Sequence, residues 1–124
     1  MVWFFWWGIR LFNEDGFARV GLNNKWNFID INGNFLSKQW FSFIYEFENG
    51  IARVDLNYKC NLIDVNGNLL SQQWFDGIGN FDKNGFVIVM LNNKYNFIDV
   101  NGKLLSQQWF DYIGEAYDYL MKLK

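Results

Sequence analysis

Short runs in which apolar and polar residues alternate recur three times along the chain. In the first run the apolar positions are Ala18, Val20 and Leu22. A period of two residues is typical of a β-strand with one buried face. The same pattern gives the equivalent apolar positions of the other two runs, which are Ala52, Val54, Leu56, Val87, Val89 and Leu91.

Each alternating run is followed by a two-residue break that contains asparagine. The breaks are Asn23-Asn24, Asn57-Tyr58 and Asn92-Asn93. Asparagine tolerates positive φ better than other residues with a side chain, so each break predicts a tight hairpin. The second strand of the first copy spans residues 25–30, and the Asn-Gly pair after it is the strongest short-range hairpin signal. A third, shorter strand is therefore predicted over residues 34–37.

The whole pattern is a tandem repeat. Gly16, Gly50 and Gly85 head three matching segments, separated by 34 and then 35 residues. Two further landmarks recur with the same offsets, so the periodicity does not depend on one residue type. These landmarks are Asn32-Gly33, Asn66-Gly67 and Asn101-Gly102, followed by Gln39-Trp40, Gln73-Trp74 and Gln108-Trp109.

The repeat defines the predicted organisation of residues 1–124 as a single repeat domain. Copies span 16–49, 50–84 and 85–117, and 5–15 is the tail of a partial copy. Units this small cannot bury their apolar faces alone, so they must stack on one another. We expect an all-β, open array of antiparallel three-stranded repeats, with a partial propeller as the alternative. A unit of ~35 residues is short for a four-stranded blade, which favours the open array.

The two ends of the chain depart from the repeat. Ala116, Leu120 and Leu123 fall at helical spacing, which predicts a short helix over residues 115–124 that caps the last copy. The apolar residues 1–7 lack the features of a secretion signal and are too few to span a membrane. We expect them to pack on the first copy or to pair with another chain, and a cytoplasmic location is the default.

The tryptophan of each Gln-Trp pair and the phenylalanine after it form the most prominent aromatic series. Adjacent residues of an extended segment face opposite ways, so only one of each pair can lie fully in one core. We predict that the tryptophans fill the seam between copies. The candidates for an exposed, ligand-binding aromatic row are Phe41, Phe75, Phe110, Trp26 and Tyr95.

An aspartate closes the second strand of every copy, at positions 30, 64 and 99. We predict that Asp30, Asp64 and Asp99 accept backbone N–H bonds from the turn that follows. The segment Asp30-Ile-Asn-Gly-Asn34 has a faint likeness to a calcium loop. An EF-hand needs a 12-residue loop closed by a glutamate, and Lys103 replaces Asn34 in the third copy, so a structural turn is the preferred interpretation.

Composition excludes several classes of function. The net charge is −2, with no run of Lys or Arg, so the basic footprint of a nucleic-acid-binding protein is missing. The chain has no histidine, which removes the commonest general base and metal ligand. Its one cysteine, Cys60, replaces Trp26 and Tyr95 of the other copies and is read as a packing residue. We expect no catalysis, no metal and no cofactor.

The segment GFARVGLNNKWNFIDINGNFLS resembles the WG repeat, also called the KWG repeat. Its usual core is a Gly-x-Ala-x-Val strand followed by Lys-Trp-Gly-Phe-Ile-Asp and a Gly turn. The chain departs from it at the motif's glycine, which is Asn27, Asn61 and Asn96 here, and keeps the motif's tryptophan only in the first copy. The matching positions are Lys25, Trp26, Phe28, Ile29, Asp30, Gly33, Lys59, Ile63, Asp64, Gly67, Lys94, Tyr95, Phe97, Ile98, Asp99 and Gly102.

The resemblance covers nearly the whole chain and implies an array of β-strands, without an enzyme activity, a cofactor or an agreed ligand. We therefore expect a non-catalytic structural or protein-interaction scaffold. Its partner would be another protein or a second copy of the chain. The alternative is a module that binds carbohydrate or another cell-surface ligand through exposed aromatic rings. Burial of the aromatic series distinguishes the two.

Overall fold

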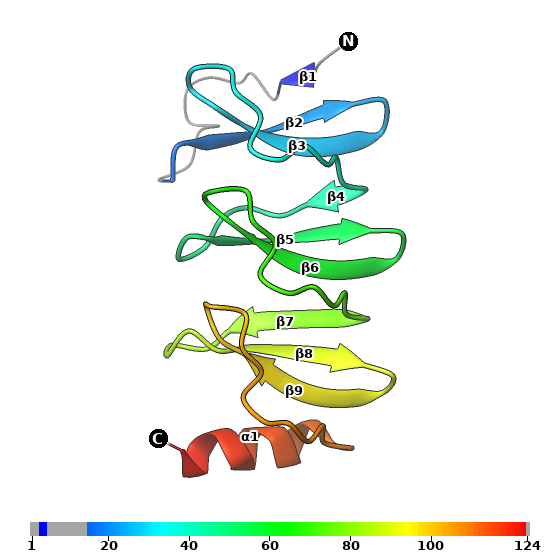
Figure 1. Ribbon diagram of the computed structural model, residues 1–124, viewed down its shortest axis with the longest axis vertical. Coiled ribbons are helices and arrows are strands. Elements are labelled where there is room, and N and C mark those ends of the chain that lie inside the picture. Colours follow the sequence, from blue (N-terminus) through cyan, green and yellow to red (C-terminus); the bar gives the residue numbers. More distant parts are fainter. Residues whose placement is uncertain (1–2, 5–14, 124) are drawn as a thin grey trace. The chain divides into compact units, whose positions relative to one another are not determined.

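The computed structural model describes residues 3–4 and 15–123, which form three antiparallel sheets and one helix (Figure 1). The chain divides into two compact units, residues 1–69 and 70–124. The first unit holds the sheets β1-β2-β3 and β4-β5-β6, and the second holds β7-β8-β9 and the helix α1. The elements are β1 (Trp3–Phe4), β2 (Phe17–Leu22), β3 (Lys25–Asp30), β4 (Phe43–Ile44), β5 (Ile51–Leu56), β6 (Lys59–Asp64), β7 (Gly77–Phe81), β8 (Val87–Leu91), β9 (Lys94–Ile98) and α1 (Ile113–Lys122).

The predicted hairpins are confirmed, and their tight turns have the backbone that the sequence required. In the first hairpin Asn23 and Asn24 have φ values of 52° and 62°. Positive φ at both central residues gives a turn whose twist matches that of the flanking strands. In the second hairpin Tyr58 takes the same conformation at φ 64°, and its side chain is fully exposed.

The third strand of each sheet is not the one that the sequence predicted. Residues 34–37 form no strand, and Phe35 makes only a single bridge with Ile29. The third strand instead precedes each hairpin, because β4 pairs with β5 and β7 pairs with β8. In the first sheet β1 pairs with β2 in the same way. The prediction of three strands per repeat is correct, but the prediction of which segment forms the third strand was wrong.

Side-chain hydrogen bonds explain why the chain does not continue as a strand after the turn. The amide N–H of Ser37 donates to Asn27 Oδ1 (3.3 Å), and its carbonyl accepts from Asn27 Nδ2 (2.7 Å). The hydroxyl of Ser37 then accepts from the N–H of Gln39 (3.0 Å). A side chain that bonds to nearby backbone offers it an alternative to a β-ladder. The hydroxyls of Ser71 and Ser106 accept the equivalent backbone N–H bonds.

Asn27, Asn61 and Asn96 stand where the usual motif has glycine, and all three are fully buried. Asn27 Oδ1 also accepts from the N–H of Phe28 (2.7 Å), so one side chain satisfies backbone groups of two segments. Asn96 makes the equivalent bonds to Phe97 and Ser106. A buried polar group is tolerated only when it is hydrogen-bonded. The asparagine therefore joins each hairpin to the loop that follows it.

We predict that Asn27→Ala lowers the free energy of unfolding by about 2 kcal/mol, because it leaves buried backbone groups of Phe28 and Ser37 without their partner. Urea denaturation followed by circular dichroism measures the change. Asn32→Ala is the matched control, since Asn32 is exposed and its loss should cost less than ~0.5 kcal/mol. Equal losses in the two variants would contradict the role given to Asn27.

The core of the first unit is largely aromatic. Phe47, from the connector between the two sheets, packs against Phe28 with ring centroids 4.6 Å apart and against Phe17 at 5.2 Å. Ile44 of the same connector is fully buried. The connector therefore joins the first hairpin to the next sheet, since Phe47 packs on the first and Ile44 pairs with β5.

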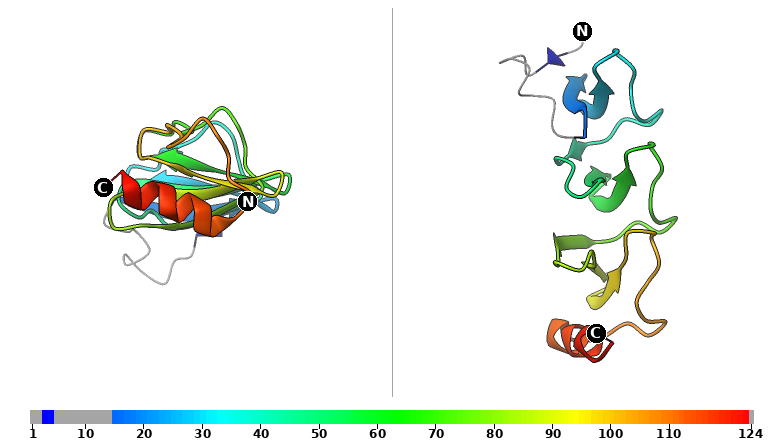
Figure 2. Two further views of the ribbon diagram at one scale, coloured as in Figure 1. Left: turned by 90° about the horizontal axis from the view of Figure 1, so that it is seen from below. Right: turned by 90° about the vertical axis from the view of Figure 1, so that its left-hand side faces the viewer.

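The predicted C-terminal helix forms as α1 and covers one side of the hairpin β8–β9 (Figures 1 and 2). Ala116 and Leu120 are buried in a cluster with Ile88 and Phe97. Leu123, which was predicted on the same stripe, is 58% exposed. The helix ends at Lys122, and Leu123 is its C-cap, so this side chain leaves the stripe before it can reach the core.

At the N-terminal end, residues 3–4 of the apolar start pair with β2 of the first copy, as one of the two expectations had it. Most of the predicted partial copy at 5–15 lies outside the described residues. Among the residues that the structure describes, no helix has the length and apolar character needed to cross a bilayer.

Candidate functional site

One face of the first unit carries aromatic and charged side chains that the strand register brings together. Phe43 of β4 lies directly opposite Asp55 of β5, and the N–H of Tyr45 donates to the carbonyl of Arg53 (2.9 Å). Side chains that lie opposite each other in an antiparallel pair project from the same face. Trp26 of β3 contacts this group. We call Trp26, Phe43, Tyr45, Arg53 and Asp55 the aromatic–arginine surface.

The three rings of this surface touch edge to face. The ring centroids of Trp26 and Phe43 are 6.1 Å apart with planes at 69°, and those of Phe43 and Tyr45 are 5.1 Å apart at 85°. Phe43 and Tyr45 are each 41% exposed, whereas Trp26 is half-buried. Edge-to-face contacts of this kind stabilise aromatic pairs beyond their buried area. The rings therefore form an ordered, solvent-accessible ridge.

Arg53 lies at one end of the ridge and is fixed by two kinds of contact. Its guanidinium lies over the ring of Tyr45, 4.9 Å from the centroid, and Nε donates to Asp55 Oδ1 (2.9 Å). Burial lowers the pKa of Arg53, but the hydrogen bond and negative charge of Asp55 outweigh it and raise the pKa above its ordinary value. Arg53 is thus a fixed cation whose position is defined before any ligand arrives.

The third sheet shows that these rings are not needed to build such a sheet. The positions of Phe43 and Tyr45 are occupied in the third sheet by Gly77 and Gly79. Facing them are the apolar side chains of Met90 and Ile88, and a Cβ added to Gly79 would lie 2.4 Å from Ile88 Cγ2. The same strand pair therefore forms without rings and without an arginine. The exposed rings of Phe43 and Tyr45 are therefore additional to what the repeat requires.

The predicted turn aspartates have the role that the sequence gave them. Asp30 Oδ1 accepts from the N–H groups of Asn32 and Asn34, both at 2.9 Å. The bond from Asn34 has the largest effect, and together these bonds lower the pKa of Asp30. Asp64 and Asp99 accept the equivalent pairs of bonds. The Asn-Gly turns close beside them, with positive φ at Gly33, Gly67 and Gly102.

The tryptophan series follows the prediction only in part. Trp40 is only half-buried and packs on Ala18, Val20 and Ile29 of its own copy, with its ring against Phe35. Trp74 and Trp109 are also half-buried, and Trp109 contacts Phe75 at 6.3 Å between ring centroids. Trp109 thus contacts the copy before it, as predicted for the seam, whereas Trp40 packs within its own copy, and none of the three indoles is fully buried.

The adjacent phenylalanines take the interior positions instead. Phe41 and Phe75 are 0% and 1% exposed, so neither ring is available to a ligand, and Phe110 is half-buried. The backbone of Phe41 pairs with that of Trp26 through two bonds of 2.7 and 2.8 Å, which directs the Phe41 ring inward. Of the five predicted ligand-binding aromatics, the structure brings Trp26 alone into the aromatic–arginine surface.

Tyr95, the remaining candidate, is half-buried and packs against the cluster beneath α1. Sequence reasoning missed Phe43, Tyr45 and Arg53, whose only sequence signal is their replacement by Gly77, Gly79 and Ile88 one repeat later. Cys60 is buried, as a packing residue should be. Within residues 3–4 and 15–123, no group of three acidic or cysteine side chains could hold a metal ion.

The model of the WG containing repeat matches the chain three times, at residues 8–26, 28–60 and 62–95. The second and third matches begin 34 residues apart, which is the first spacing found from the sequence alone. No curated protein and no solved structure matches the chain. Because the matches cover more than half of its residues, the chain belongs to the WG repeat family.

Proposed function

We propose that this chain is a non-catalytic scaffold that binds another protein through the aromatic–arginine surface of its first unit. The observation that carries the proposal is the ordered set of accessible rings beside Arg53, at positions where the third sheet has only glycine and aliphatic residues. Aromatic residues and arginine are enriched among the residues that dominate binding energy at protein interfaces. A ridge fixed in advance also loses little entropy on binding.

A protein partner fits this surface better than a carbohydrate does. The planes of neighbouring rings are turned by 69° and 85°, so the ridge offers edges and faces in turn instead of one flat platform. A sugar chain would stack on only one ring at a time. Protein side chains can pack into the angles between rings. Carbohydrate binding is therefore the alternative outcome of the experiment below.

Two features of the sequence support the non-catalytic part of the proposal. The chain contains no histidine, and its one cysteine is buried in the first unit. General acid–base and nucleophilic chemistry most often depends on these residue types in accessible positions. The aspartates that recur in the repeat accept backbone bonds at turns, which is a structural task.

The experiment compares protein capture by the native chain and by the double variant Phe43→Ser, Tyr45→Ser. Each chain is immobilised and exposed to extract of its native host, and bound proteins are identified by mass spectrometry. We expect at least one partner to be lost in the double variant, with binding reduced about tenfold or more, because truncating such an anchor costs over ~1–2 kcal/mol. Light scattering shows whether a second copy of the chain is that partner.

Tyr112→Ser is the matched control, since Tyr112 is 72% exposed and belongs to the second unit. This variant should capture the same proteins as the native chain, and all three chains should give the same circular dichroism spectrum. Capture that the double variant retains in full would refute the proposed site. Binding to a glycan array that depends on Tyr45 would replace it with the carbohydrate alternative.

A further inference from the structure

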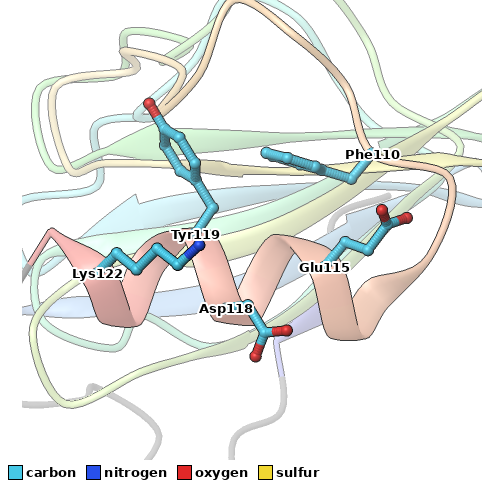
Figure 3. A pocket seen from close by; sticks show the side chains of 5 residues that line it. All are labelled: Phe110, Glu115, Asp118, Tyr119 and Lys122. Carbon is cyan, nitrogen blue, oxygen red and sulfur yellow. The ribbon is translucent and has the colours of Figure 1, made fainter.

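A pocket of about 240 Å³ lies in the second unit, between α1 and the segment that leads into it (Figure 3). Phe110 and Tyr119 form its aromatic wall, with ring centroids 5.4 Å apart and planes tilted by 44°. Glu115, Asp118 and Lys122 complete the lining. All five residues belong to the second unit, so this site is separate from the aromatic–arginine surface.

The charged part of the lining favours a cation. The lining contains two carboxylates and one ammonium group, so it carries a net charge of −1 at neutral pH. Glu115 is held in place because its Oε1 accepts from the N–H of Tyr112 (3.2 Å) at the start of the helix. This bond occupies one oxygen and leaves the other able to accept from a ligand. In Figure 3 the Glu115 carboxylate lies on the side of the helix toward Phe110.

We propose that this pocket binds a guanidinium group. A guanidinium is planar and weakly hydrated, so it can stack on an aromatic wall while it donates to a carboxylate. The tilted pair Phe110–Tyr119 supplies the wall, and Glu115 supplies the carboxylate. The group could reach the pocket as free arginine or as the arginine side chain of a protein, and the two sources share this chemistry.

The first test is a titration followed by ¹H–¹⁵N NMR. The probes are acetyl-arginine amide and its neutral isostere, acetyl-citrulline amide, which differs in charge while keeping the planar shape. We expect millimolar binding of the arginine probe, with shifts confined to the five lining residues and their neighbours, because cation–π pairs at accessible sites are weak. Equal binding of the citrulline probe, or shifts elsewhere, would overturn the proposal.

Two variants then test the charges. Glu115→Gln keeps an oxygen that can accept from Tyr112, so the helix start is preserved while the charge is lost. It should weaken binding of the arginine probe about tenfold, the usual worth of a charge-assisted bond. Lys122→Gln removes the competing cation and should strengthen binding several-fold. If Lys122→Gln weakens binding, or Glu115→Gln leaves it unchanged, the pocket does not select a cation.

Matched controls separate binding from folding. Lys94→Gln removes another exposed lysine of the second unit, one paired with Asp111 outside the lining, and should leave binding unchanged. Each variant should retain the native helix content by circular dichroism. Free arginine and the peptide Gly-Gly-Arg-Gly-Gly are compared last. Tighter binding of one of them identifies the source of the group, and binding of neither overturns the proposal.

Discussion

Replacing Phe41 with alanine should lower the free energy of unfolding by about 3–5 kcal/mol, the usual cost of truncating a buried phenylalanine. The ring is fully buried, and two backbone bonds between Phe41 and Trp26 fix its position. The surrounding strands cannot collapse into the space without breaking these bonds. We therefore expect Phe41→Ala to be among the most destabilising single substitutions in the chain.

Trp40→Ala is the matched comparison, because it removes a larger side chain from the next position in the sequence. Trp40 is only half-buried, so its loss should cost about 1–2 kcal/mol. Urea denaturation followed by far-ultraviolet circular dichroism gives both values without relying on tryptophan fluorescence. If Trp40→Ala were the more damaging variant, the inward residue of each Trp-Phe pair would be the indole and the assignment made here would be wrong.

The Trp-Phe pairs show how far local sequence can go. Alternation requires that one residue of each pair faces inward, but it does not say which one. Size and hydrophobicity favoured tryptophan as the interior residue. The choice is made by the backbone pairing of Phe41 with Trp26, fifteen positions earlier in the chain. Such register information is absent from any short window of sequence.

The turns were predictable because their chemistry is local. Positive φ at Asn23 and Asn24, and the bonds that Asp30 accepts, involve residues no more than four positions apart. The third strand was not predictable in the same way. The sequence signal at Asn32-Gly33 indicates a turn. The side chain of Asn27 then hydrogen-bonds to the backbone of Ser37, so the segment after the turn does not continue as a strand.

The aromatic–arginine surface lies between these two cases. Phe43 and Tyr45 are visible in the sequence as exceptions to the repeat, since the second copy has Gly77 and Gly79 there. Their proximity to Arg53 and Trp26 depends on the pairing of β4 with β5 and on the ring contact with β3. A repeat protein thus offers its own internal comparison: positions that differ between copies of one fold are free to serve binding.

The Asn-Gly turns give the second large effect. An added Cβ on Gly102 would lie 2.0 Å from the carbonyl oxygen of Leu70, and one on Gly67 would lie 2.4 Å from that of Leu36. At Gly33 an added Cβ meets nothing within 4 Å. The three glycines share φ values of 84° to 86°, so the backbone strain of a substitution is the same at each. The three positions therefore differ in whether an added methyl group would collide with a neighbouring loop.

Gly33→Ala should therefore cost only the left-handed strain, about 1–2 kcal/mol. Gly102→Ala adds a collision with backbone that cannot rotate away, so the free energy of unfolding should fall by a further ~1–3 kcal/mol. Thermal and urea denaturation of the two variants measure the difference directly. Because strain cancels in the comparison, equal losses would mean that the turn at Gly102 does not pack closely on the loop at Leu70.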